Sequence, residues 1–343
     1  MKFEKIHLDD ITRCYCASHM FIDGEPFVFF ASEDPNSPCN IYSGEDFKNK
    51  ENLWEDRGGC MSIIPFENRS GEFLAVNEFY LKVSPSHAKL VWGKKADGKW
   101  EVKDVFNLPY LHRFDIFHVD NKDYVLVTTI ARDKKNKEDW TRPGQVYVGE
   151  IPADLDNDNV VLKQIIDNQF RNHGYYRDKR EGHDAGYIAS DQGVFKIEPP
   201  KNGSDWTVTK IKDGMTSEVA VGDIDNDGID EMITIEPFHG NTIKIYKLDE
   251  KCTEVYNYPH ELDFAHALKY DVIGGKKCFV GGIRRVDAEL FVIYCDNNEF
   301  VLDRVDLGGG PANVDVIHAF NNDYILAANH TKNEAAIYKY TGE

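Results

Sequence analysis

The feature of this sequence that most restricts its fold is an internal repeat. An apolar segment rich in Val, Ile, Phe and Tyr, a short polar turn and a second apolar segment recur seven times along the 343 residues. The copies begin about 45 to 60 residues apart, at Cys14, Cys60, Arg113, His173, Glu218, His266 and Asn313. A period near 50 residues accommodates four short strands, which is one blade of a β-propeller. The pattern therefore predicts an all-β, seven-bladed β-propeller.

The two ends of the chain predict how the ring closes. After Asn313 only about 31 residues remain, enough for three strands, whereas residues 2–8 resemble a strand that belongs to no copy. We expect this segment to be the outer strand of the last blade, which leaves no open sheet edge. Because no linker or shift in composition divides the sequence, we expect residues 1–343 to form a single domain. A pair of sandwiches or a solenoid is the alternative.

Charge and composition restrict the partners and the compartment. The chain carries 59 acidic and 40 basic side chains, a net charge of −19, which argues against nucleic acid and anionic membranes as partners. Seven scattered cysteines form no C-x-x-C pair, and neither a signal peptide nor a long apolar run is evident. We therefore expect a cytoplasmic protein with free thiols.

The repeat alignment sorts the polar residues between the two ends of the propeller. The starts of innermost strands and the loops after second strands should share one mouth of the central channel, where propellers usually bind ligands. The histidines expected there are His112, His173, His239, His266 and His330, with His183 near them. The other polar residues expected there are Asn77, Glu78, Arg113, Glu218, Glu236, Arg284, Arg285 and Asn329. His19, His118 and His318 fall in the turns at the opposite end.

Three of these histidines form a candidate metal site. Neutral imidazoles suit zinc or a similar divalent ion, and we select His173, His239 and His266 as ligands. Glu218 is expected to be a fourth ligand or a general base. The alternative is a solvated polar rim that binds no ion.

A second candidate cation site is the acidic loop G-D-I-D-N-D-G-I-D-E. Its spacing gathers carboxylates that suit calcium, and Gly228 permits the tight backbone course. The candidate ligands are Asp223, Asp225, Asp227 and Glu231. The alternative is an Asx turn with no ion. A calcium ion here would be structural, because the loop is predicted to lie far from the histidines.

Two family resemblances follow from these motifs. The acidic loop resembles the cation loops of FG-GAP and VCBS propeller repeats. The order R-F-D-I, N-H-G, then G-D-I-D-N-D-G and E-P-F-H-G resembles the propeller of aldos-2-ulose dehydratases, also called 1,5-anhydrofructose dehydratases. The second resemblance implies a metal-dependent lyase that eliminates water from a small ketosugar. It also implies that Glu218 or His112 is the base and that Arg113 or Tyr175 orients the sugar.

The remaining expectations concern the substrate and the alternatives. On the lyase hypothesis the partner is a small-molecule sugar, and the residues expected to contact it are Glu78, Glu236, Arg284, Arg285 and His330. The sequence leaves open whether the chain forms a homo-oligomer. Trp140, in a loop over the same mouth, and Phe238 are further candidates for ligand contact or for blade packing. One alternative is another sugar-active lyase or hydrolase on this fold. The other is a non-catalytic FG-GAP-type propeller that binds a ligand or a protein.

Overall fold

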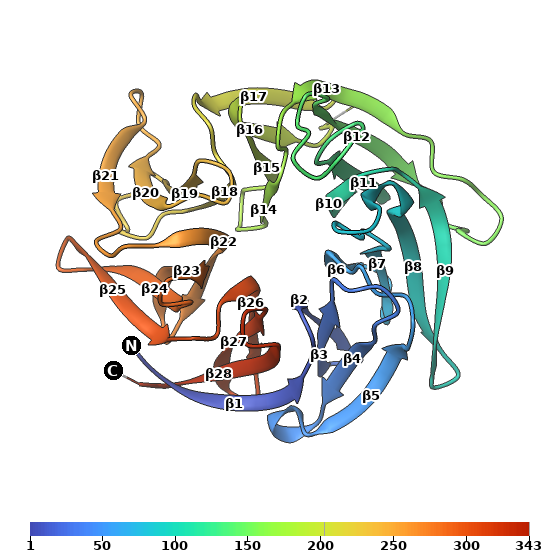
Figure 1. Cartoon of the computed structure of the whole chain (residues 1–343), viewed down its shortest axis with the longest axis horizontal. Coiled ribbons are helices and arrows are strands. Elements are labelled where there is room, and N and C mark those ends of the chain that lie inside the picture. Colours follow the sequence, from blue (N-terminus) through green and yellow to red (C-terminus); the bar gives the residue numbers. More distant parts are fainter. Residues whose placement is uncertain (202, 343) are drawn as a thin grey trace.

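Seven four-stranded antiparallel sheets form a ring in the computed structural model, which describes residues 1–201 and 203–342 (Figure 1). In the first six blades the strands are paired in chain order, and each innermost strand begins within about three residues of the start predicted from the repeat. The predicted all-β, seven-bladed propeller is confirmed.

The first three blades carry two short 3-10 helices in addition to their strands. Blade one contains β2 (Cys14–Ile22), β3 (Glu25–Ser32), β4 (Cys39–Ser43) and β5 (Asn49–Trp54), with η1 (Glu45–Phe47) between the last two. Blade two contains β6 (Ser62–Pro65), β7 (Glu72–Asn77), β8 (Lys89–Ala96) and β9 (Lys99–Asn107), with η2 (Pro85–His87) before β8. Blade three contains β10 (Leu111–Val119), β11 (Lys122–Thr129), β12 (Gly144–Ile151) and β13 (Lys163–Gln169).

The remaining blades have the same plan. Blade four contains β14 (Gly174–Asp178), β15 (Ala185–Ser190), β16 (Gly193–Glu198) and β17 (Thr207–Lys212). Blade five contains β18 (Glu218–Gly222), β19 (Glu231–Glu236), β20 (Thr242–Lys247) and β21 (Thr253–Asn257). Blade six contains β22 (Asp263–Ile273), β23 (Lys276–Arg285), β24 (Leu290–Asp296) and β25 (Glu299–Asp306). Blade seven contains β26 (Pro311–Ala319), β27 (Asn322–Asn329) and β28 (Glu334–Gly342).

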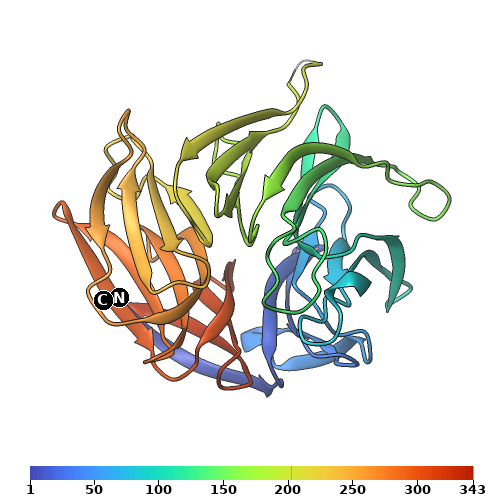
Figure 2. The same ribbon diagram turned by 45° about the horizontal axis from the view of Figure 1, so that its top comes forward.

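The N-terminal strand closes the ring, as predicted. β1 (Lys2–Asp10) pairs antiparallel with β28 as the outer strand of blade seven, and Figure 2 shows the two strands side by side. The Lys5 ammonium forms ion pairs with Asp306 at 2.8 Å and with Glu334 at 2.7 Å. Ile6 and Leu8 pack against the core. First and last segments of the chain thus hold the same sheet together.

The core lies between neighbouring blades, so the inner strands are apolar on both faces. β3 and β19 are buried over most of their length, whereas the outer strand β13 is largely exposed. Between blades one and two the rings of Phe29 and Phe73 meet, with centroids 6.2 Å apart. Gly93 leaves room for the Phe73 ring, since a β-carbon there would lie 2.0 Å from it. This two-sided packing explains the continuous apolar runs in the sequence.

The seven cysteines are free, and five of them are buried between strands. Within the described residues, the chain has no helix with the length and apolar character needed to cross a membrane.

Candidate functional site

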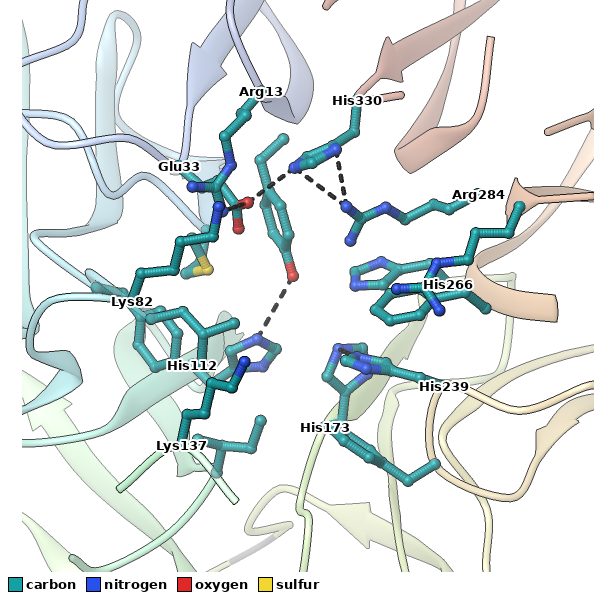
Figure 3. Close-up of a pocket in the computed structure, with 18 of the residues that line it drawn as sticks. Arg13, Glu33, Lys82, His112, Lys137, His173, His239, His266, Arg284 and His330 are labelled. Atoms are coloured by element: carbon teal, nitrogen blue, oxygen red, sulfur yellow. Dashed lines mark hydrogen bonds and ion pairs between the residues drawn. The ribbon is translucent and has the colours of Figure 1, made fainter. Parts of the chain in front are cut away.

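A cavity of about 570 Å³ opens at one mouth of the propeller; we call it the funnel (Figure 3). Its walls come from starts of innermost strands and from loops that follow second strands, as the alignment predicts. Seven of the predicted site residues line it: His112, His173, His239, His266, Arg284, Arg285 and His330. The register inferred from the repeat therefore places most of the mouth correctly.

Close packing between blades four and five positions the histidines. His173 directly precedes β14, and a β-carbon on the neighbouring Gly174 would lie 2.5 Å from the carbonyl oxygen of Ser217. Glycine is therefore needed for blade four to approach blade five. On the other side of Ser217, the backbone N–H of His239 donates to the Ser217 hydroxyl at 3.0 Å. His239 itself has a φ of 47°, which turns its loop toward the funnel.

Three imidazoles converge at the base of the funnel. Each of His173, His239 and His266 offers a ring nitrogen, and these nitrogens all lie within 4.8 Å of one another. The Nε2 atoms of His173 and His239 are 3.2 Å apart. Burial lowers the pKa of each of the three well below its ordinary value, with neighbouring arginines adding to the effect. The cluster is therefore neutral at neutral pH.

Hydrogen bonds fix the tautomers of two of these rings. His266 Nδ1 lies 2.7 Å from the carbonyl oxygen of Ala312, and His173 Nδ1 lies 3.2 Å from that of Ser217. A carbonyl oxygen only accepts, so Nδ1 carries the proton in both rings. The Nε2 lone pairs therefore face the centre of the cluster, where that of His173 meets His239 Nε2 at 3.2 Å, and Nδ1 bonded to a carbonyl oxygen is the arrangement found in metal-bound histidines. The donor set therefore fits a divalent ion.

The proposed acid–base residues are divided between two cavities. His112 faces the funnel and lies 3.5 Å from the Tyr15 hydroxyl. Glu218, Arg113 and Tyr175 line a separate cavity of about 180 Å³ in the channel beneath it. There Glu218 contacts Arg113 at 3.5 Å and His173 Nδ1 at 2.8 Å. Burial raises the pKa of Glu218 to about 8, against the opposing effect of Arg113.

Two predicted sugar contacts do not face the funnel. Glu78 forms an ion pair with Lys89 at 2.9 Å, and Glu236 forms one with Lys212 at 2.9 Å. Both carboxylates are thus engaged by lysines outside the funnel.

The three histidines that the alignment assigns to the opposite end each pair with an aspartate. The partners are Asp315 for His19, Asp123 for His118 and Asp271 for His318.

Basic residues surround the funnel although the chain as a whole is acidic. The cations that line it are Arg13, Lys82, Lys137, Arg284 and Arg285, and the carboxylates are Glu33 and Glu138. Glu33 is already paired with Arg13 and accepts from His330 Nε2 at 2.7 Å. The lining thus carries more positive than negative groups.

Arg284 is a half-buried cation in this wall. Its Nη2 donates to His330 Nδ1 at 2.8 Å, a neutral acceptor, and its Nε is buried without a hydrogen-bond partner. Among the described residues no carboxylate lies within ion-pair distance of its guanidinium. Burial lowers the pKa of Arg284, with Glu33 opposing.

Aromatic rings complete the wall. Trp140 and Phe238 meet with centroids 5.1 Å apart, and Phe264 lies beneath both arginines of the rim, 4.7 Å from Arg284 and 4.4 Å from Arg285. Sequence reasoning missed Phe264, Arg13, Lys82 and Lys137. Phe264 could have been found, because it precedes His266 by two positions and so shares its side of an innermost strand. The others lie in loops, where the strand register gives no signal.

A lysine lies among the carboxylates of the acidic loop. Lys247 Nζ forms ion pairs with Asp225 at 2.6 Å, Asp227 at 2.5 Å and Glu231 at 2.9 Å. Asp223 pairs with Lys277 at 3.0 Å. The Asx turn is present as well, since the Asp225 carboxylate accepts from the backbone N–H of Asp227 at 3.1 Å. Calcium binding by this loop stays a prediction, and any ion would compete with the Lys247 ammonium.

Comparison with known proteins supports the fold. No family model and no curated protein matches the sequence. Similar solved structures include the β-propeller domain of Cps50 (Swd1) from Myceliophteria thermophila, at 11% identity and a TM-score of 0.62, covering 99% of this chain and 100% of that one. BBS1N in complex with ARL6DN has 12% identity and a TM-score of 0.61, covering 100% and 97%. Sqt1 from Saccharomyces cerevisiae has 8% identity and a TM-score of 0.59, covering 100% and 99%.

These findings correct the enzyme hypothesis. The prediction of a hydro-lyase is wrong, and so is the prediction of a small-molecule sugar as partner: of the three similar structures, one is described as a β-propeller domain, one as a complex with another protein, and none as a sugar enzyme. The resemblances to aldos-2-ulose dehydratases and FG-GAP repeats find no support. The geometry agrees in one respect, since two of the predicted sugar contacts, Glu78 and Glu236, are engaged by lysines and do not line the funnel.

Proposed function

We propose that this chain is a non-catalytic propeller that binds a protein partner at the funnel. The observation that carries the proposal is the composition of the funnel wall, where Trp140, Phe238, Phe264 and three arginines surround one cavity. Aromatic residues and arginine supply most of the binding energy at protein interfaces, and they act best around a pocket that excludes water. BBS1N, a propeller of similar fold, is described in complex with the protein ARL6DN.

The loops around the funnel suit this role. Leu81 is 38% exposed at its rim, and the loop that carries Trp140 extends over it from blade three. The aromatic side chains of the funnel wall are held by their neighbours, since the Phe238 ring stacks on the His239 ring with centroids 3.9 Å apart. Side chains that are already ordered lose little entropy on binding.

We also propose that His173, His239 and His266 hold a divalent metal ion, with zinc as the preferred ion. The Nε2 lone pairs of His173 and His266, which face the centre of the cluster, and the neutral state of all three rings support this assignment. When bound, the ion would supply positive charge and a position for an oxygen ligand at the base of the funnel. The chain's own contribution is to hold the three rings at that base through the backbone contacts of Ser217 and Ala312.

Photocrosslinking from two matched positions tests the protein-binding proposal. A photoreactive phenylalanine analogue replaces Leu81 at the funnel or Val272, which is 39% exposed and lines the opposite mouth. We expect one protein to be captured from Leu81 in the native cells, and its capture to be lost when Phe264→Ala is added to the folded chain. Absence of a captured protein at Leu81, or equal capture of the same protein from Val272, would contradict the proposal.

A further inference from the structure

We propose that the segment entering the funnel is an acidic stretch of the partner protein, with one carboxylate that meets Arg284. This inference rests on the proposed protein-binding function and adds the chemistry of the partner. Figure 3 shows Arg13, Arg284 and two lysines directed toward one space, with Glu33 held at its edge. The funnel is thus a basic recess in a chain whose net charge is −19.

The local charges are complementary to carboxylates. Five cations and two carboxylates line the funnel, and Glu33 is engaged by Arg13 and His330. On the rim, Lys137 and Glu138 are both highly exposed, so their contact at 3.4 Å is weak and leaves the lysine available. Arg285 pairs with the exposed Asp263 at 3.1 Å, a contact that a ligand carboxylate can replace. An acidic segment would therefore meet several cations that lack strong internal partners.

Arg284 identifies where a carboxylate would enter most deeply. Its guanidinium stacks on Phe264 and donates to the neutral His330 ring, which leaves Nε as a buried donor without an acceptor. A half-buried guanidinium with no directly paired carboxylate costs the free protein stability, and a carboxylate can accept two parallel hydrogen bonds from a guanidinium. Binding of a glutamate or aspartate side chain would remove this cost. The neutral acceptor at His330 Nδ1 keeps the guanidinium in place without competing for its charge.

The walls favour a peptide over other anions. Trp140, Phe238 and Phe264 offer apolar area that an inorganic anion cannot use, and the cavity of about 570 Å³ accepts several side chains. A nucleic acid would bring many phosphates against a surface that is acidic outside the funnel, which opposes its binding. A short segment with both acidic and apolar side chains satisfies the cations and the rings together.

Fluorescence anisotropy with two labelled peptides tests the inference. The probe is a short peptide in which glutamates flank one phenylalanine, and its analogue carries glutamines at the same positions. We expect the glutamate peptide to bind at low salt, and both the glutamine analogue and the Arg284→Gln variant to bind at least about tenfold more weakly, or about 1.4 kcal/mol. Lys179→Gln is the matched control, since Lys179 is an exposed cation at the opposite mouth with a surface ion pair to Glu67.

Each outcome decides between the two proposals. Equal binding of the two peptides, or an equal loss in Lys179→Gln and Arg284→Gln, would overturn the acidic-segment inference. If Arg284→Gln does not fold, Arg285→Gln on the exposed rim replaces it, with the same expected direction. If Leu81 crosslinks a protein but the glutamate peptide does not bind, protein binding stands and the inference on partner chemistry is wrong. If Leu81 captures no protein, the proposed function falls as well.

Discussion

Replacing Lys247 by methionine should make the stability of this propeller depend on calcium. The Lys247 ammonium lies among Asp225, Asp227 and Glu231, where the acidic loop was predicted to hold a metal ion. Methionine keeps most of the side-chain volume and removes the charge. The three carboxylates would then repel one another, and their spacing suits calcium once the ammonium has gone.

The burial of the carboxylates around Lys247 determines how much stability the Lys247→Met substitution should cost. The Glu231 side chain is fully buried, whereas that of Asp227 is 47% exposed, so the site is intermediate between a buried and a surface ion pair. Removing one partner of a buried pair costs about 3–5 kcal/mol, and we take the lower end, about 3 kcal/mol. With an unfolding entropy of about 0.7 kcal/mol/K for a chain of this length, the melting temperature should fall by about 4 °C. Calcium at a hundred times its dissociation constant should restore about 2.7 kcal/mol.

Calorimetry with and without calcium measures these shifts. Lys244→Met is the control, because Lys244 lies on the same strand and pairs at 2.7 Å with the more exposed Glu254. We expect it to cost less than about 1 kcal/mol and to be insensitive to calcium. An unchanged melting temperature of Lys247→Met, or a calcium-dependent rise in the unmodified protein, would refute the idea that Lys247 acts as the internal cation of this loop.

Three further predictions concern other parts of the molecule. Deleting residues 1–10 should lower the melting temperature by more than about 5 °C and promote aggregation seen by light scattering, because it exposes an edge strand; an unchanged melting temperature would rule out closure by β1. His266→Ala should reduce bound zinc, measured by elemental analysis, from about one ion per chain to less than a tenth, and full retention would exclude this ligand. The hydrogen bond with Asp271, together with that to Asp323, raises the pKa of His318 to about 9. Its contribution to stability, limited to about 0.5–1 kcal/mol by exposure, should be present below pH 6.5 and lost as pH rises through 9; an NMR titration with a pKa near 6.5 would contradict this.

The blades were predictable because strands and turns are local. Apolar runs broken by Asp, Asn and Gly predict the first residue of each innermost strand to within about three residues. The seven copies of this pattern predict a ring of seven blades. The short tail after Asn313 likewise predicts that the first strand closes the last blade. The same register brings His173, His239 and His266 together, since the starts of innermost strands, which carry His173 and His266, share one mouth with the loop after β19, which carries His239.

Side-chain partners could not be predicted in the same way. Glu78 and Glu236 lie at the expected ends of β7 and β19, but Lys89 of the next strand and Lys212 of the neighbouring blade engage them outside the funnel. Lys247 lies 25 residues beyond the end of β18, the strand that precedes the acidic loop, and reaches the carboxylates of the loop through the pairing of β19 with β20. Residues that share a column can also face different cavities, as Glu218 and His112 do.

Backbone hydrogen exchange, with and without the glutamate peptide, tests binding at the funnel most directly. We predict slower exchange on binding in residues 79–82, 134–140 and 238–239, which carry the rim and its aromatic rings. Turn residues 23–24 and 320–321, which lie at the opposite end, should exchange at unchanged rates. Slower exchange at those turns, with none at the funnel, would contradict the assignment of the funnel as the binding surface.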